Sequence, residues 1–260
     1  MSGISSIGGS MNTNIYSQLA SGRRINSAAD GAAETSIINK EDAQIKGLEA
    51  GSSNIKSAQD LLKVADGGVG RITDSLQRMR ELAVYASNDA VLSNSDKRAI
   101  QDEIDQLKQG ISEISEQTSF NTRKLLDGDA QDLKVATDSN GNAQSMSVGS
   151  ATLKSLGIED FDVTKDFNIA AIDEALSKIS ENRSNIGAQS NSLDYAFMSN
   201  SQTSYDITSA KSRTEDLDYP QAVSEKKKQE TLQAYALMAQ KKKEEEEELK
   251  MQNFFTQSAM

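Results

Sequence analysis

Residues 48–86 decide the fold. They read LEAGSSNIKSAQDLLKVADGGVGRITDSLQRMRELAVYA, and their apolar side chains recur every seven residues. One series comprises Leu48, Ile55, Leu62, Val69, Leu76 and Ala83, and a second comprises Ala58, Ala65, Ile72, Met79 and Ala86. The second series follows the first by three residues, which is the a/d spacing of a helical seam. The pattern predicts one helix over about 32–88, roughly 85 Å long if continuous. Gly67, Gly68 and Gly70 would weaken its middle, because each glycine costs about 1 kcal/mol relative to alanine.

Two further segments carry matching apolar seams. A second helix, capped by Asn94 or Ser95 and ending near Gln117, is predicted from the spacing of Ile100, Ile104, Leu107, Ile111 and Ile114. A third helix is predicted from about Asn168, with one series of Ile172, Ile179, Ile186 and Leu193 and another of Ile169, Leu176 and Phe197. Arg183 and Ser190 interrupt the latter series, where polar residues cost stability but can fix register. Pro220 is expected to open a fourth helix near its first turn.

Between these helices the periodicity changes from helical to alternating. Leu133 and Val135 alternate with polar residues before Asn140-Gly141, and Met146 and Val148 do so after it, which predicts a β-hairpin. The predicted fold class is therefore mainly α: an elongated bundle of long heptad-patterned helices from both chain halves, with a small β-hairpin region in the middle. The expected organisation is a flexible N-terminal segment over 1–30, N-terminal rod helices over 31–118, a small β-region over 119–166, a C-terminal rod helix over 167–218 and a charged C-terminal helix or tail over 219–260.

Composition excludes several kinds of chemistry and partner. The chain contains no histidine, cysteine or tryptophan, so disulfides, cysteine-ligated zinc, thiol nucleophiles and histidine triads are ruled out. The net charge of -11 resides in residues 1–224, since residues 225–260 hold seven lysines and seven glutamates. An acidic body disfavours nucleic acid, and no stretch approaches the roughly 20 apolar residues needed for membrane insertion. The opening MSGISSIGGS predicts no cleavable signal peptide.

No motif predicts an enzyme, a cofactor or a metal site. Phosphate-loop and dinucleotide patterns are missing from the sequence, and Asp138-Ser139-Asn140-Gly141 fits hairpin turn chemistry better than a calcium loop. The densest acidic group, Glu215, Asp216 and Asp218, precedes a helix start, where the helix dipole favours acids. Composition alone leaves a Ser–Lys dyad or a carboxylate pair open. The sequon Asn182-Arg183-Ser184 lies within a helical heptad and is interpreted as structural.

Two surfaces are candidates for binding. Arg78, Glu81, Leu82 and Tyr85 share one helical stripe, and the seam positions of Leu76 and Met79 turn that stripe outward. This stripe is either a protein-contact surface or part of ordinary bundle packing. The second surface is the run from Lys226 to Glu248, which is either a solvated helix laced with salt bridges or an electrostatic partner site.

The sequence resembles bacterial flagellin at several ordered positions. Residues 21–33 read SGRRINSAADGAA and resemble the family's S-G-x-R-I-N-S-A-x-D-x-A-A, while residues 77–84 read QRMRELAV and are similar to Q-R-x-R-E-L-A-V. Residues 101–104 (QDEI) and 117–121 (QTSFN) match Q-x-E-I and Q-T-x-F-N, and residues 186–189 and 209–216 resemble the C-terminal L-G-A-x and T-x-A-x-S-R-I-E-D. The matches cover about residues 12–224. Only about 126–165 separates the two halves, so large outer domains are expected to be missing.

The resemblance implies a structural subunit of the bacterial flagellar filament. Its partners would be other flagellin subunits in a homopolymer, together with the flagellar export apparatus and an export chaperone. The chain would be secreted without a cleaved signal and located in the extracellular flagellum. The resemblance also implies recognition by the innate immune Toll-like receptor 5 through Arg78, Leu82 and Glu103, with Glu81 beside them.

The sequence departs from the family pattern at both ends. The family's leucine-spaced helix is not evident before Arg23, and lysine and glutamate runs replace an uncharged C-terminal helix. Burying those charges unpaired would be costly. Two alternatives to the filament subunit therefore stay open: a secreted, non-polymerising flagellin-like ligand and a hook–filament junction protein.

Overall fold

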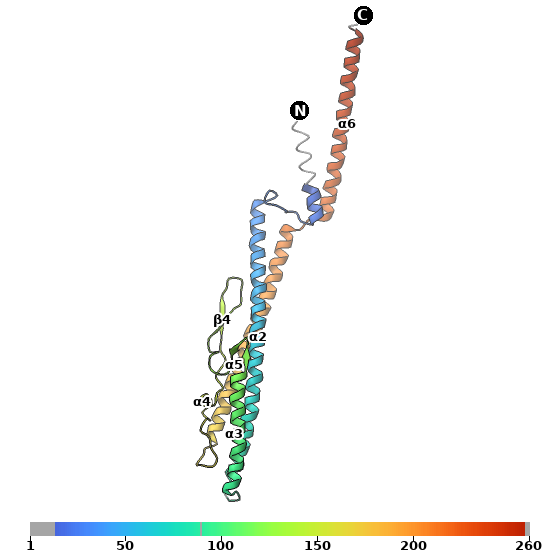
Figure 1. Cartoon of the computed structure of the whole chain (residues 1–260). Coiled ribbons are helices and arrows are strands. Elements are labelled where there is room, and N and C mark those ends of the chain that lie inside the picture. Colours follow the sequence, from blue (N-terminus) through green and yellow to red (C-terminus); the bar gives the residue numbers. More distant parts are fainter. Residues whose placement is uncertain (1–13, 89, 258–260) are drawn as a thin grey trace. The chain divides into compact units, whose positions relative to one another are not determined.

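The computed structural model describes residues 14–88 and 90–257 (Figure 1). A short helix over residues 14–21 precedes α2 (Ala32–Ala86), α3 (Asn94–Gln117), α4 (Leu153–Leu156), α5 (Ala170–Glu215) and α6 (Tyr219–Gln257). Four short strands form two antiparallel pairs: β1 (Ser119–Phe120) with β2 (Arg123–Lys124), and β3 (Leu133–Ala136) with β4 (Ala143–Met146). The predicted class is confirmed: long helices come from both chain halves, and the small β-region lies between them in the sequence. The chain divides into two compact units, one of residues 44–205 and one of the described residues before 44 and after 205.

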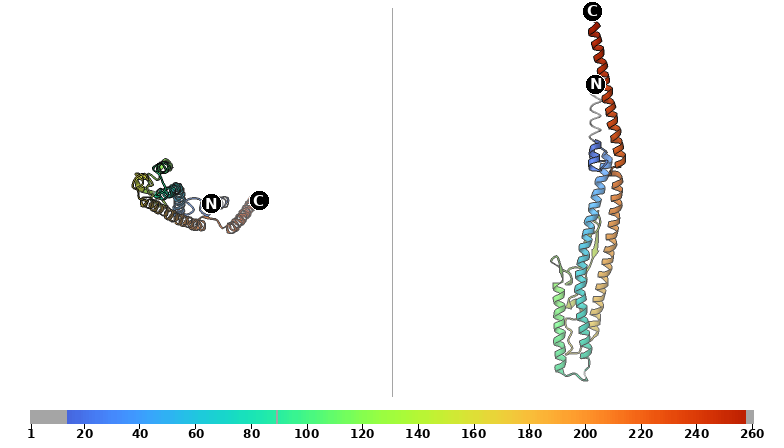
Figure 2. Two further views of the ribbon diagram at one scale, coloured as in Figure 1. Left: turned by 90° about the horizontal axis from the view of Figure 1, so that it is seen from below. Right: turned by 90° about the vertical axis from the view of Figure 1, so that its right-hand side faces the viewer.

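In the unit of residues 44–205, α2, α3 and α5 lie side by side around one apolar core (Figure 2). All eleven seam positions predicted for α2 are buried, and Ile172, Ile179, Ile186 and Leu193 are the buried face of α5. From α3, Ile100, Ile104 and Ile111 join the same core. Removal of these side chains from water is the main source of stability for the three helices. The heptad spacing therefore identified the core correctly.

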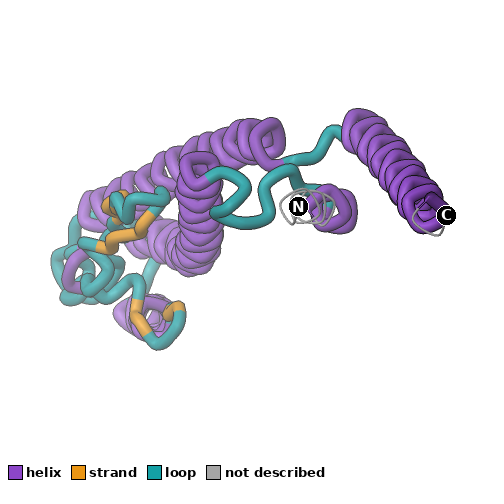
Figure 3. Tube along the Cα trace, turned by 90° about the horizontal axis from the view of Figure 1, so that it is seen from above, coloured by secondary structure: helices purple, strands orange, loops and turns teal. Residues whose placement is uncertain are grey.

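The predicted hairpin is confirmed, and α5 holds it through side-chain amides. Leu133 pairs with Met146 and Ala136 with Ala143, while the Asp138 carboxylate accepts the backbone N–H groups of Asn140 and Asn142 across the turn. Figure 3 shows the strands and loops of this region gathered on one side of the helices. Asn182 both accepts the N–H of Gly149 at 2.9 Å and donates to its carbonyl oxygen at 2.8 Å, so the sequon asparagine has a structural role. Gln189 binds the backbone of Ser147 in the same way: its side-chain oxygen accepts the Ser147 N–H, and its side-chain nitrogen donates to the Ser147 carbonyl oxygen, each at 2.8 Å.

The glycines of α2 do not interrupt the helix, which differs from the expected weak point. Gly67 and Gly70 meet open space, whereas a Cβ at Gly68 would lie 2.8 Å from atoms of Thr118 and Leu126. A Cβ at Gly51 would lie 2.6 Å from the carbonyl oxygen of Thr137 in the hairpin. Packing therefore requires glycine at Gly51 and Gly68, and the two open positions carry only the helix-propensity cost.

Two helix boundaries differ from, or add to, the sequence-based predictions, and a third agrees with them. The N-cap of α3 is Ser93 rather than Asn94 or Ser95: its hydroxyl accepts the N–H of Asp96, and the Asp96 carboxylate accepts the N–H of Ser93. Residues 14–21 are helical, although no helix was predicted before Arg23. Of the expected flexible segment over 1–30, residues 1–13 lie outside the described residues. Pro220 is the second residue of α6, as predicted.

Helix α6 presents almost all of its described side chains to solvent. Leu232, Tyr235, Leu237 and Met238 are each more than half exposed. Among residues 219–251, whose side chains the structure describes, ion pairs join only Lys226 to Glu230 and Lys228 to Glu225. Among these described side chains, the predicted salt-bridge lacing of this charged helix is therefore limited to residues 225–230. None of the described helices is long and apolar enough to cross a bilayer.

Candidate interaction surface

Arg78 is the centre of a charged cluster that joins α2 to α3. Its guanidinium donates from Nε to Glu103 Oε1 at 2.8 Å and from Nη1 to Glu81 Oε2 at 3.1 Å, and Nη2 lies 2.8 Å from the same Glu103 oxygen. The Arg78–Glu81 spacing of three residues follows from one turn of α2, whereas Glu103 is brought in by the return of α3 along it. Three of the four residues predicted for receptor binding are thus in direct contact.

The cluster is open to solvent and to a partner. The side chains of Arg78, Glu81 and Glu103 are 49%, 68% and 45% exposed. Hydrogen bonds from the guanidinium to Glu103 first, and to Glu81 second, raise the pKa of Arg78, which is protonated at any physiological pH. Exposed ion pairs contribute little to stability, because water and salt screen them. The cluster can therefore exchange these bonds for bonds to a partner at little cost to the fold.

The sequence analysis placed Leu82 on the outward stripe of this helix, but the structure shows that its side chain is buried. It is only 7% exposed and belongs to the same apolar cluster as Ile100 and Ile104 of α3. The prediction treated α2 as having one narrow seam, but α2 packs against both α3 and α5, so its buried face is wider. Tyr85, by contrast, is 60% exposed as expected. Val84 and Val91, which were not singled out from the sequence, are also exposed nearby.

A second arginine on α2 provides a comparison with Arg78. Arg80 is also 49% exposed and donates from Nε to Asp173 of α5 at 2.7 Å. Further along α5, Arg183 donates from Nε to Asp66 of α2 at 2.9 Å. Arg183, which interrupts the apolar series of α5, therefore lies at the edge of the core and forms an ion pair with Asp66 there. Arg80 thus ties α2 to α5, whereas Arg78 ties α2 to α3.

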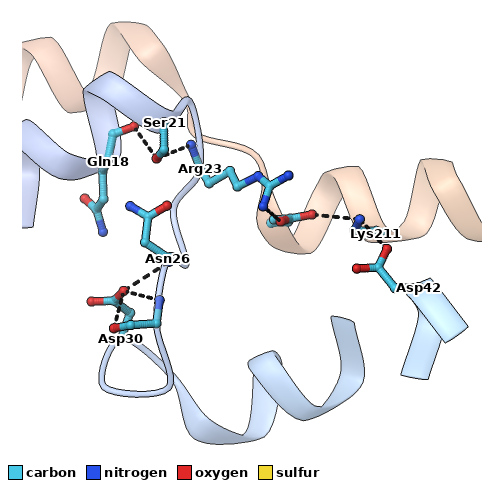
Figure 4. A network of polar contacts seen from close by, with 9 residues as sticks. Gln18, Ser21, Arg23, Asn26, Asp30, Asp42 and Lys211 are labelled. Carbon is cyan, nitrogen blue, oxygen red and sulfur yellow. Dashed lines mark hydrogen bonds and ion pairs between the residues drawn. The ribbon is translucent and has the colours of Figure 1, made fainter. Parts of the chain in front are cut away.

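The first flagellin-like motif, in the other unit, builds a polar network at the end of α5 (Figure 4). Glu215, whose side chain is 8% exposed, lies 3.0 Å from the Arg23 guanidinium and 3.3 Å from Lys211 Nζ. Lys211 also reaches Asp42 of α2 at 2.5 Å, and these two carboxylates raise its pKa. Burying a glutamate is tolerated here because two cations surround it. The sequence analysis interpreted Glu215 only as an acid that precedes a helix start.

Backbone bonds complete this network. Arg24 donates its N–H to the Glu215 carbonyl oxygen at 2.7 Å and its guanidinium to the Thr214 carbonyl oxygen at 2.7 Å, so it satisfies two of the open carbonyls at the C-terminus of α5. Asp30 accepts the N–H groups of Asn26 and Ser27, and these bonds lower its pKa. The polar run at 21–30 therefore has a structural explanation. Within residues 14–88 and 90–257 no group of three or more acidic side chains is arranged to hold a metal ion.

Long helices from both chain halves that share one seam, a small hairpin region and an exposed charged surface define a helical structural protein. A model of the bacterial flagellin N-terminal helical region matches residues 4–131, and a model of the bacterial flagellin C-terminal helical region matches residues 169–248. The chain therefore belongs to the bacterial flagellin family, whose members are structural proteins of the flagellar filament.

Individual relatives agree with this assignment. The flagellin of Halalkalibacterium halodurans is 37% identical over 216 residues, which cover 80% of this chain and 79% of that relative. The flagellin of Bacillus subtilis is 32% identical over 264 residues and covers 86% of both chains. The crystal structure of Bacillus cereus flagellin superposes with a TM-score of 0.51 at 30% identity, over 57% of this chain and 88% of that one.

Proposed function

We propose that this chain is exported through the flagellar export apparatus and polymerises with further copies of itself into the extracellular filament. The observation that carries the proposal is the shared seam of α2 and α5, in which a helix from each family-matched region buries its apolar face against the other. A chain whose long helices share one apolar seam fits a structural building block.

Expression of the chain in a bacterium that lacks its own flagellin tests export and assembly together. The expected result is long filaments on the cell surface and restored swimming. Secreted chain that stays in the medium as monomer would instead indicate a non-polymerising ligand. Short cell-bound caps without filament growth would indicate a hook–filament junction protein.

We further propose that the Arg78 cluster is the contact surface for Toll-like receptor 5. Support comes from the juxtaposition of Arg78, Glu81 and Glu103, which presents a cation and two carboxylates in one exposed patch. Arginine is enriched among the residues that dominate binding energy at protein interfaces. Leu82 is buried, so we assign it the role of holding α2 against α3 rather than of touching the receptor.

Titration of the receptor ectodomain against purified monomers tests this surface. Arg78→Ala should weaken binding at least about tenfold, which corresponds to 1.4 kcal/mol. Arg80→Ala is the matched control, because Arg80 has the same exposure and also forms an interhelix ion pair. The control should bind like the wild type. Equal affinities for both variants, or no binding by the wild type, would refute the proposal.

A further inference from the structure

The turn of the β3–β4 hairpin contains Asn140-Gly141, which is the one Asn-Gly pair in the sequence. Asn140 is exposed, and among the residues that the structure describes none forms a hydrogen bond with its side-chain amide. Gly141 has a φ of 79°, and a Cβ added to it would meet open space. The side-chain amide of Asn140 is therefore free beside a glycine whose surroundings are open.

Asn142, two residues further on, provides a comparison within the same turn. It is also exposed, but its side-chain amide donates to Asp138 Oδ2 at 2.6 Å. The residue that follows it, Ala143, begins β4 and pairs with Ala136 of β3. Asn142 is thus fixed both through its side chain and through its successor in the chain. Asn140 is fixed only through its backbone N–H, which donates to Asp138 Oδ1 at 2.9 Å.

We propose that Asn140 is a site of spontaneous covalent modification, at which the folded chain loses ammonia and gains aspartate or isoaspartate. The backbone nitrogen of Gly141 attacks Cγ of Asn140 and forms a new C–N bond. The bond from Cγ to Nδ2 breaks, and Nδ2 leaves as ammonia with the proton of the Gly141 N–H. Water then opens the cyclic imide. Addition of water at Cγ gives aspartate, and addition at the main-chain carbonyl carbon gives isoaspartate, whose main chain is one carbon longer.

The surroundings of the turn favour ring closure. The nucleophile and the electrophile belong to neighbouring residues, so the step is intramolecular and needs only a rotation of the chain. Glycine permits that rotation, and it has no side chain to hinder the approach of its nitrogen. The N–H of Gly141 makes a long hydrogen bond, 3.4 Å, to the Asp138 carbonyl oxygen, so little is lost when the nitrogen moves. Water for the second step reaches the exposed turn directly.

The modification would change a turn that lies against α2. A Cβ at Gly47 would lie 2.8 Å from Cα of Ser139, so the backbone next to Asn140 touches this helix. Either product adds a carboxylate to a turn that already contains the ionised Asp138, whose bonds to backbone N–H groups organise it. Isoaspartate also shifts those N–H groups, because it lengthens the main chain. The modified hairpin is therefore expected to be held less firmly.

Incubation of the purified full-length monomer for several days at neutral pH tests the proposal, which does not depend on filament assembly. Peptide mass spectrometry should detect conversion of amide to acid at Asn140 at least about tenfold faster than at Asn142. A carboxyl methyltransferase specific for isoaspartate should label the aged chain at the same peptide. Chain kept unfolded in urea is the positive control, because there the Asn-Gly pair reacts without constraint from the fold.

Two matched substitutions separate this site from other asparagines. Asn140→Gln should reduce methyltransferase labelling at least about tenfold, because glutamine would have to close a larger and slower ring. Asn142→Gln, in the same turn, should leave the labelling at the wild-type level. Equal rates at Asn140 and Asn142 would overturn the proposal. Conversion of Asn140 in urea without conversion in the folded chain would overturn it as well, since the turn would then protect the residue.

Discussion

Replacing glycine by alanine at two positions of α2 should change stability in opposite directions. Gly67 and Gly51 lie on the same helix 16 residues apart, and alanine is the better helix former at both. Alanine at Gly67 meets open space, whereas alanine at Gly51 would place its Cβ 2.6 Å from the carbonyl oxygen of Thr137 and 2.8 Å from its carbon. Those are backbone atoms, so a side-chain rotation cannot relieve the contact.

The magnitudes follow from these surroundings. Gly67→Ala should raise the free energy of unfolding by about 0.5–1 kcal/mol, through helix propensity and the reduced freedom of the unfolded chain. Gly51→Ala gains the same stabilisation from helix propensity and reduced unfolded-chain freedom, but the clash with the Thr137 backbone adds an overpacking cost of about 1–3 kcal/mol. The carbonyl oxygen of Thr137 also accepts a 2.6 Å hydrogen bond from Asn200. If the new methyl group displaces this oxygen, Asn200 must shift as well to keep the hydrogen bond. A net loss of about 1 kcal/mol is therefore expected.

Thermal unfolding of the monomers, followed by circular dichroism, measures both effects. A change of 1 kcal/mol corresponds to a shift of about 2–4 °C in the midpoint for a chain of this size. Gly67→Ala should unfold at a higher temperature than the wild type and Gly51→Ala at a lower one. If Gly51→Ala stabilises as much as Gly67→Ala, the hairpin is not seated on α2.

Three further predictions follow from the core, the tail and one loop. Leu62→Asp and Ile179→Asp should each unfold the helices, since both side chains are 1% exposed and an unpaired charge would be buried; unchanged helical circular dichroism in both would show that the seam is misassigned. Deletion of residues 226–260 should leave the thermal midpoint of the remaining helices unchanged but impair export or assembly, and normal incorporation of the truncated chain would exclude both roles. Hydrogen bonds from Thr164, and then from Lys165, lower the pKa of Asp162 from 3.8 to about 2, so the stability that its ionised form contributes is present above pH 4 and lost as the pH falls towards 2. Asp162→Asn should therefore destabilise at pH 7 and not at pH 2, and a pH-independent difference would contradict this.

The seams were predictable from the sequence because residues seven apart lie on the same side of a helix, so an apolar residue that recurs every seven positions marks the buried side. Eleven core positions of α2 recur at seven-residue intervals, and the helix is long enough for that period to be unambiguous. The hairpin was predictable for a similar reason, since alternating residues flank Asn140-Gly141. Capping was less precise, because Ser93, Asn94 and Ser95 are all good caps and only the geometry distinguishes them.

The remaining features depend on contacts between segments distant in the sequence. Burial of Leu82 requires knowing that two helices, not one, pack on α2. The pairing of Arg78 with Glu103 spans 25 residues, and that of Arg23 with Glu215 spans 192, so no local pattern contains them.

Sedimentation of the purified monomer tests most directly whether this chain builds filaments. Above a threshold concentration, the protein should pellet on ultracentrifugation, and electron micrographs of the pellet should show long filaments of uniform diameter. The supernatant concentration should then stay constant as total protein increases, as expected for a polymer in equilibrium with its subunit. Protein that remains in the supernatant at every concentration, with its helical circular dichroism intact, would contradict the assignment of this chain as a filament subunit.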